Sequence, residues 1–91
     1  MCALVWEDRS SRIDHESLEQ HLWEQVADDL RTMIGSRELP PGAKLPNERE
    51  LAELYAVSRP TTRRAVFELR KEGLLIVVTG KGTFVRRAER P

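Results

Sequence analysis

The first regular pattern of apolar positions in the chain predicts an amphipathic helix. Seven apolar residues recur at steps of three and four positions: Leu22, Trp23, Val26, Ala27, Leu30, Met33 and Ile34. This spacing places them on one face of a helix. Ser17 is the expected N-cap, with Gln20 as its capping-box partner. The helix is predicted to end near Gly35 and Ser36, before the turn-rich segment ELPPGAKLP.

A second, shorter helix is predicted to begin after Asn47. Asn47 suits the N-cap position, and Glu50 is placed to bond back to the cap amide. The apolar side of this helix consists of Leu51, Ala52, Leu54 and Tyr55. The helix is predicted to stop at Ala56 and Val57.

A third helix is predicted after only three further residues, 56–58. Ser58 is its expected N-cap, and Pro60 is tolerated because first-turn amides have no intrahelical acceptor. Gly73 marks its C-terminal end. One stripe of this helix should face the core: Thr62, Ala65, Val66 and Leu69.

The periodicity changes after Gly73. The segments LLIVVT and TFVRR are rich in β-branched and aromatic residues and flank Gly80, Lys81 and Gly82, which predicts a β-hairpin with a glycine turn. Three helices followed by a C-terminal two-stranded hairpin form an α+β fold, the winged helix-turn-helix. We expect residues 1–16 to be a flexible or partly ordered arm, residues 17–87 this domain, and residues 88–91 a tail.

Positive charge is concentrated in the second half of a chain whose net charge is zero. Residues 1–56 carry six Lys and Arg against twelve Asp and Glu, a net charge of −6, and residues 57–91 carry nine against three, a net charge of +6. This asymmetry indicates either a surface for a polyanion or two halves that attract each other.

Three of these cations lie at the start of the third helix. At 100° per residue, Arg59, Arg63 and Arg64 lie on the side away from the core stripe. Two short helices joined by three residues form a helix-turn-helix, whose second helix enters the major groove of DNA. There, arginine binds guanine O6 and N7. A solvated helix face is the simpler explanation, but a hairpin that follows directly, with Lys81 at its tip, favours DNA binding.

The composition argues against other classes of protein. No apolar run approaches the roughly 20 residues that span a bilayer, and the N-terminus lacks the basic segment of a signal peptide. The single Cys2 fits a reducing compartment. His15 and His21 lack a clustered third metal ligand, and no glycine-rich phosphate loop follows a strand. We therefore expect a cytoplasmic protein that is not an enzyme, with no cofactor and no membrane partner.

Residues 38–85 resemble the winged-helix DNA-binding domain of the GntR family of bacterial transcription regulators. The order and spacing of LPNERELA, VSRPTTRRA, EGLL and GKGTFV carry the resemblance, and LWEQVADDLRTMI matches the opening helix of the family. The resemblance implies a sequence-specific regulator of transcription that binds double-stranded DNA, with a palindromic duplex containing GT…AC as a suggested target. Repression by occupying a promoter is the simplest mode of action.

Eleven residues are expected to contact DNA: Arg49, Ser58, Arg59, Pro60, Thr61, Arg63, Arg64, Thr79, Gly80, Lys81 and Gly82. The resemblance implies that Arg49 and Arg59 read guanines in the major groove, and that Thr61 and Arg63 touch phosphates or nearby bases. It also implies that residues 80–82, the wing, lie along the minor groove or the backbone.

Several of these residues have simpler explanations. Arg49 can pair with Glu53 one turn later. Arg64 and Arg70 can be solvated or directed loosely at phosphates, and Glu48 and Glu50 can simply complement the helix dipole. The DNA-binding hypothesis therefore requires that the side chains at positions 49, 59 and 63 converge on one solvent-facing ridge and are not tied up in carboxylate pairs.

The chain departs from the family pattern at three places. Ala56 and Arg37 stand where the family has glycine, so we expect an adjusted turn at Ala56 and an early end of the first helix, at Gly35. Family members also carry a C-terminal domain that binds a small-molecule effector and dimerises, whereas no effector domain is evident here.

A dimer on a palindromic operator would need an interface. Phe67 is expected to be exposed, and Leu4, Val5 and Trp6 in the arm are apolar. Either the arm folds onto its own domain or these residues form a dimer contact. The alternative function is a winged-helix module that binds another protein, or that binds DNA only as an architectural element.

Overall fold

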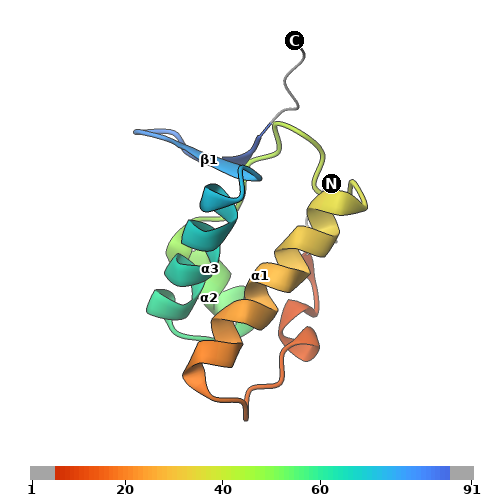
Figure 1. Ribbon diagram of the computed structural model, residues 1–91, viewed down its shortest axis with the longest axis vertical. Coiled ribbons are helices and arrows are strands. Elements are labelled where there is room, and N and C mark those ends of the chain that lie inside the picture. Colours follow the sequence, from red (N-terminus) through yellow and green to blue (C-terminus); the bar gives the residue numbers. More distant parts are fainter. Residues whose placement is uncertain (1–5, 87–91) are drawn as a thin grey trace.

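The computed structural model describes residues 6–86, with Glu19 and Gln20 described by their backbone alone. The elements are the 3-10 helix η2 (Arg9–Arg12), helices α1 (Glu19–Gly35), α2 (Glu48–Tyr55) and α3 (Arg59–Lys71), and strands β1 (Leu75–Val78) and β2 (Gly82–Val85). The three helices pack against one another, and the antiparallel hairpin extends from the end of α3 (Figure 1). The predicted winged helix-turn-helix is confirmed.

The core lies between α1, α2, α3 and the base of the hairpin. Its fully buried side chains include Val26, Leu30, Met33, Leu51, Tyr55, Ala65 and Leu69. The predicted core stripe of α3 is buried at Thr62, Ala65 and Leu69, whereas Val66 is only partly buried. Within residues 6–86, no helix combines the length and the apolar character needed to cross a membrane.

The predicted caps are correct for two of the three helices. The Asn47 side chain accepts a hydrogen bond from the Glu50 amide at 2.8 Å, and the Glu50 carboxylate accepts one from the Asn47 amide at 3.0 Å. Ser58 Oγ caps α3 by accepting from the Thr61 amide at 3.3 Å. Short-range pairing of this kind is local chemistry, which is why the sequence reveals it.

The prediction of Ser17 as the N-cap of α1 is wrong. Leu18 occupies that position without a side-chain hydrogen bond to the helix, and α1 begins at Glu19. Ser17 Oγ instead accepts a hydrogen bond from Gln25 Nε2 at 3.0 Å, so its oxygen is used by the second turn of α1 rather than by the helix start. The proposed role of the Gln20 side chain lies outside the described residues.

Two residues adopt left-handed backbone conformations where the GntR resemblance leads one to expect glycine. Ala56, at the end of α2, has φ 58° and ψ 46°, and Arg37, after α1, has φ 73°. The turn between α2 and α3 is therefore not adjusted for alanine. The Val57 amide still closes it on the Ala52 carbonyl at 3.0 Å. Non-glycine residues pay a conformational cost in this region.

The hairpin has a defined register and a third partner. Val78 pairs with Gly82, so the connecting loop is residues 79–81, and Gly82 belongs to β2 rather than to the turn as predicted. On its other side, β2 forms a bridge between Phe84 and Lys44. Gly82 has φ 127°, a backbone conformation that favours glycine, and the Lys44 side chain lies against it, with Cε 2.8 Å from where a Cβ atom would be.

Residues of the N-terminal arm pack on their own domain. Ile13 is buried in the core, and the buried Arg9 guanidinium donates to Asp29 Oδ2 at 2.9 Å. Asp29 also accepts from the Tyr55 hydroxyl at 2.7 Å. Burial, reinforced by Asp29, raises the pKa of the Tyr55 hydroxyl, so it remains a donor. Because its acceptor is a carbonyl, His15 Nε2 donates to the Tyr55 backbone oxygen, at 2.8 Å.

From Trp6 onwards the arm therefore folds onto its own domain, since Trp6 packs against the core. Leu4 and Val5, the other apolar arm residues, lie outside the described residues.

We expect Asp29→Asn to lower the free energy of unfolding by about 3 kcal/mol, because it leaves the buried Arg9 charge without its anion. Chemical denaturation measures the change. Asp28→Asn is the matched control, since the Asp28 side chain is 72% exposed and its ion pair with Arg31 should contribute less than about 1 kcal/mol. Equal, small effects of the two substitutions would contradict a structural role for the buried pair.

Ala56→Gly is expected to raise the free energy of unfolding by about 1 kcal/mol, because glycine adopts the left-handed conformation without the strain that alanine bears. Thermal or chemical denaturation checks this. Ala52→Gly, inside α2, is the control and should have the opposite sign, since glycine destabilises helix interiors. A loss of stability in Ala56→Gly would show that the turn is not strained.

Candidate nucleic-acid interface

The start of α3 places two arginines beside a glutamate of α2. Arg59 Nη2 lies 3.3 Å from Glu48 Oε1, and Arg63 Nε forms an ion pair with Glu48 Oε2. The two arginine side chains are 57% and 65% exposed. One turn of α3 separates them, so both point outwards on the face that Glu48 borders. The expected convergence is therefore observed for Arg59 and Arg63, through a shared carboxylate.

Arg49 is paired along its own helix. Its Nη1 lies 3.2 Å from Glu53 Oε2, one turn later in α2, which is the simpler arrangement considered from the sequence. All three guanidinium groups that the DNA-binding hypothesis requires are thus in contact with carboxylates, and the condition that they be free of such pairs is not met.

These pairs leave the arginines available, because all three are exposed to solvent. Exposed ion pairs contribute only about 0.2–1 kcal/mol, so a phosphate or a base edge can displace them. The hydrogen bond from Arg63, together with that from Arg59, lowers the pKa of Glu48 below its ordinary value. Glu48 therefore stays ionised at neutral pH, and the group of Glu48, Arg59 and Arg63 carries a net charge of +1.

The first turn of α3 uses its own polar groups internally. Thr61 is buried, and its hydroxyl lies 2.8 Å from the Ser58 hydroxyl. The amides of Thr61 and Thr62 both contact the Ser58 carbonyl, and Pro60 has no amide hydrogen. The polar groups at the start of α3 are therefore used within the helix itself. The attraction of an anion to this end of α3 comes mainly from the arginine side chains.

Arg64 lies towards α1. Its guanidinium carbon is 4.4 Å from the ring centroid of Trp23, and its Nε is 2.9 Å from Glu68 Oε2. Arg64 therefore stacks on α1, unlike Arg59 and Arg63, which share the carboxylate of α2.

The wing is exposed at its tip. Thr79, Gly80 and Lys81 are exposed, and the Lys81 amide closes the turn on the Val78 carbonyl at 2.9 Å. Lys44 adds a cation beside the wing, since its side chain lies against Gly82. Sequence reasoning missed Lys44, because only the bridge between residues 44 and 84 brings it there.

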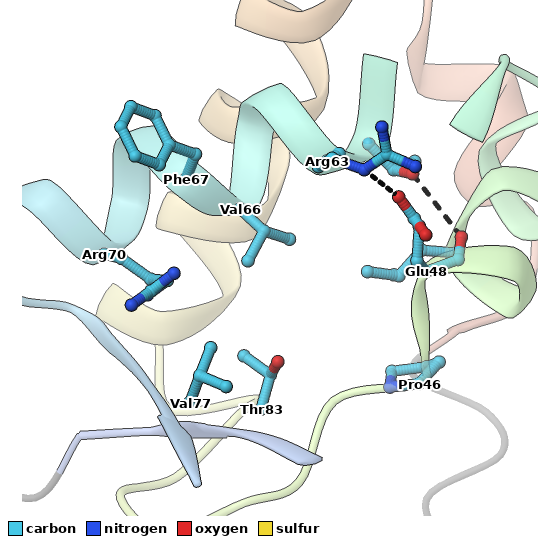
Figure 2. A pocket seen from close by; sticks show the side chains of 10 residues that line it. Pro46, Glu48, Arg63, Val66, Phe67, Arg70, Val77 and Thr83 are labelled. Atoms are coloured by element: carbon cyan, nitrogen blue, oxygen red, sulfur yellow. Dashed lines mark hydrogen bonds and ion pairs between the residues drawn. The ribbon is translucent and has the colours of Figure 1, made fainter. Parts of the chain in front are cut away.

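A groove of about 430 Å³ runs between α3 and the hairpin. Figure 2 shows Val66, Phe67 and Arg70 on the α3 side, Val77 and Thr83 on the hairpin side, and Glu48 beside Arg63 at one end. Its lining is mainly apolar, with Arg63 and Arg70 as cations. Among the residues whose side chains are described, no group of three His, Cys, Asp or Glu could hold a metal ion.

Comparison with known proteins finds relatives that match most of this chain. It is 44% identical over 66 residues to the HTH-type transcriptional repressor NagR of Bacillus subtilis, covering 72% of this chain and 27% of that protein. The chain thus spans about a quarter of the length of this relative.

Two solved structures share the fold. The DNA-binding domain of AraR, in complex with operator ORX1, matches with a TM-score of 0.66 and 40% identity, covering 69% of this chain and 76% of that one. YtrA from Sulfolobus acidocaldarius, a GntR-family transcription factor, matches with a TM-score of 0.69 and 34% identity, covering 75% and 71%.

The family model for bacterial regulatory proteins of the gntR family matches residues 22–85, from the fourth residue of α1 to the end of β2. Because this match includes most of α1, all of α2 and α3, and the wing, the chain belongs to the gntR family of bacterial regulatory proteins.

Proposed function

We propose that this chain binds double-stranded DNA in a sequence-specific manner and acts as a transcriptional repressor. One observation supports this most directly: Arg59 and Arg63 stand exposed on the outer face of α3, in a fold that AraR uses in complex with operator DNA. Bacterial chromosomal DNA lies in the cytoplasm, so the proposed function places the protein there.

In this proposal the start of α3 enters the major groove. Arg59 exchanges its long contact with Glu48 for the O6 and N7 atoms of a guanine, a bidentate arrangement that suits a planar guanidinium. Arg49 leaves Glu53 to read a second guanine. Arg63 contacts a phosphate or a neighbouring base. Ser58, Pro60 and Thr61 hold the helix start in position, and Thr61 is the least accessible of these because it is buried.

The wing contributes contacts that do not depend on sequence. Lys81 at the tip, with Thr79, Gly80 and Gly82, is proposed to follow the backbone or the minor groove. Lys44 lies beside Gly82 and adds a second cation there. Phosphate contacts of this kind set the register of a protein on the duplex and make binding dependent on salt.

We further propose that two copies bind a palindromic operator, because one winged helix offers few base contacts and half-sites are normally read by two-fold symmetric dimers.

The named relatives are transcription regulators, which favours a binding role over a catalytic one. Arg64 and Thr61 are the expected DNA contacts with the least support, since Arg64 stacks on Trp23 and Thr61 is buried.

The test begins with a duplex selected by the protein from a random pool. Arg59→Ala should relax discrimination at one guanine by about 1–3 kcal/mol. Lys81→Ala should weaken binding to all duplexes alike and reduce the slope of log affinity against log salt by about 1. Fluorescence anisotropy at several salt concentrations measures both. A protein that selects no sequence, or an Arg59→Ala variant with unchanged preference, would contradict the proposal.

Glu48→Gln should strengthen binding to duplexes of any sequence by about 1 kcal/mol, roughly fivefold, because it releases two exposed arginines from a carboxylate. Since the pKa of Glu48 is lowered, the difference from the wild type should persist from pH 7 to pH 5 and vanish only below the ordinary value of 4.5.

Glu24→Gln is the control for this substitution, because it removes the same charge from α1, where the exposed Glu24 contacts His21. Equal gains in affinity for the two variants would mean that net charge alone is responsible, and that the Glu48 contacts do not restrain the reading arginines.

A further inference from the structure

The outer face of α3 carries one large apolar side chain that neither the core nor the proposed contacts use. Phe67 is 49% exposed. At 100° per residue it lies about 40° from Arg63 and about 20° from Pro60 around the helix axis. It therefore continues the ridge that begins at the start of α3, one turn beyond Arg63. Arg63 and Phe67 both line the groove between α3 and the hairpin (Figure 2).

Cations surround this apolar side chain. Lys71 Nζ lies 5.3 Å from the centroid of the Phe67 ring, and Arg63 and Arg70 line the same groove. The Arg70 side chain makes no hydrogen bond or ion pair with the described residues. Glu48 pairs with Arg63 and Glu68 pairs with Lys71, so the border of this apolar ring keeps a net charge of +1.

The charges around Phe67 distinguish between two possible binding partners of this face, a second copy of the chain and a DNA duplex. A second copy docked symmetrically through the same face would bring Arg63, Arg70 and Lys71 of both copies together, and their charges would repel. A DNA duplex instead presents phosphates to the cations. In its major groove the only apolar group on a base edge is the 5-methyl group of thymine, which phenylalanine can contact.

We infer that Phe67 reads the 5-methyl group of a thymine in the operator, and is thus a specificity-determining residue. The inference rests on the proposed function. It also predicts the position of the thymine. Phe67 follows Arg59 by eight residues, or about 12 Å along the helix, so the thymine should lie about three to four base pairs from the guanine assigned to Arg59.

The experiment is a thermodynamic cycle on the selected duplex. Each thymine is replaced in turn by uracil, which keeps every hydrogen-bonding group and removes only the methyl group. For the wild-type chain, replacement at one thymine should weaken binding about fourfold, the effect expected for one buried methyl group. For Phe67→Ala the same replacement should have no effect, although the variant still selects the guanine read by Arg59.

Phe67→Leu is the companion variant, because leucine keeps an apolar side chain and should retain part of the response to uracil. Leu18→Ala is the matched control: Leu18 is also exposed, at 67%, but it precedes α1 and should leave the uracil response intact. Circular dichroism establishes that each variant is folded.

Two outcomes would overturn the inference. Additive effects of uracil and Phe67→Ala at every thymine would show that Phe67 does not contact a methyl group. A dimer that dissociates in Phe67→Ala, seen by sedimentation equilibrium together with additive cycles, would make the residue a protein contact instead. In both cases the guanine preference of the wild type remains, so failure here is distinct from failure of the proposed function.

Discussion

The packing of α3 against α1 determines what the outer surface of this protein can do. Ala65 and Leu69 of α3 and Leu30 of α1 are buried in the same core. Once these residues face inward, the helical period fixes the opposite face, and Arg59, Arg63 and Phe67 have no alternative to facing solvent. The functional surface thus follows from the burial of residues that never touch a ligand.

A second constraint orients α2 and α3 relative to each other. The turn between them is held by the left-handed backbone of Ala56 and by the Ser58 cap. The carbonyl of Tyr55, one residue earlier, accepts a hydrogen bond from His15, and the Tyr55 hydroxyl donates to the buried Asp29, which also binds Arg9. The N-terminal arm therefore supports the helix-turn-helix from behind.

The sequence alone predicts those features whose causes are local. Asn47 and Ser58 cap helices through residues three positions away, and the wing follows from glycines within one hairpin. Ser17 was misassigned because its oxygen is taken by Gln25, eight residues later. The contacts of Asp29 with Arg9 and Tyr55 span 20 and 26 residues. Those of Glu48 with Arg59 and Arg63 span 11 and 15. No periodicity or motif encodes such pairings, since they depend on how the helices pack.

Glu48 changes how the charge asymmetry of the chain should be interpreted. The positive half, residues 57–91, carries a net charge of +6, but several of its arginines are already opposed by carboxylates: Arg59 and Arg63 by Glu48, and Arg64 by Glu68. A phosphate that binds one of these three arginines must therefore compete with an internal anion. This reduces the electrostatic binding that every duplex shares, whereas a guanine edge offers Arg59 two hydrogen bonds that Glu48 does not match at 3.3 Å. In the proposed function, discrimination between DNA sequences thus arises partly from the internal ion pairs that these arginines form when DNA is absent.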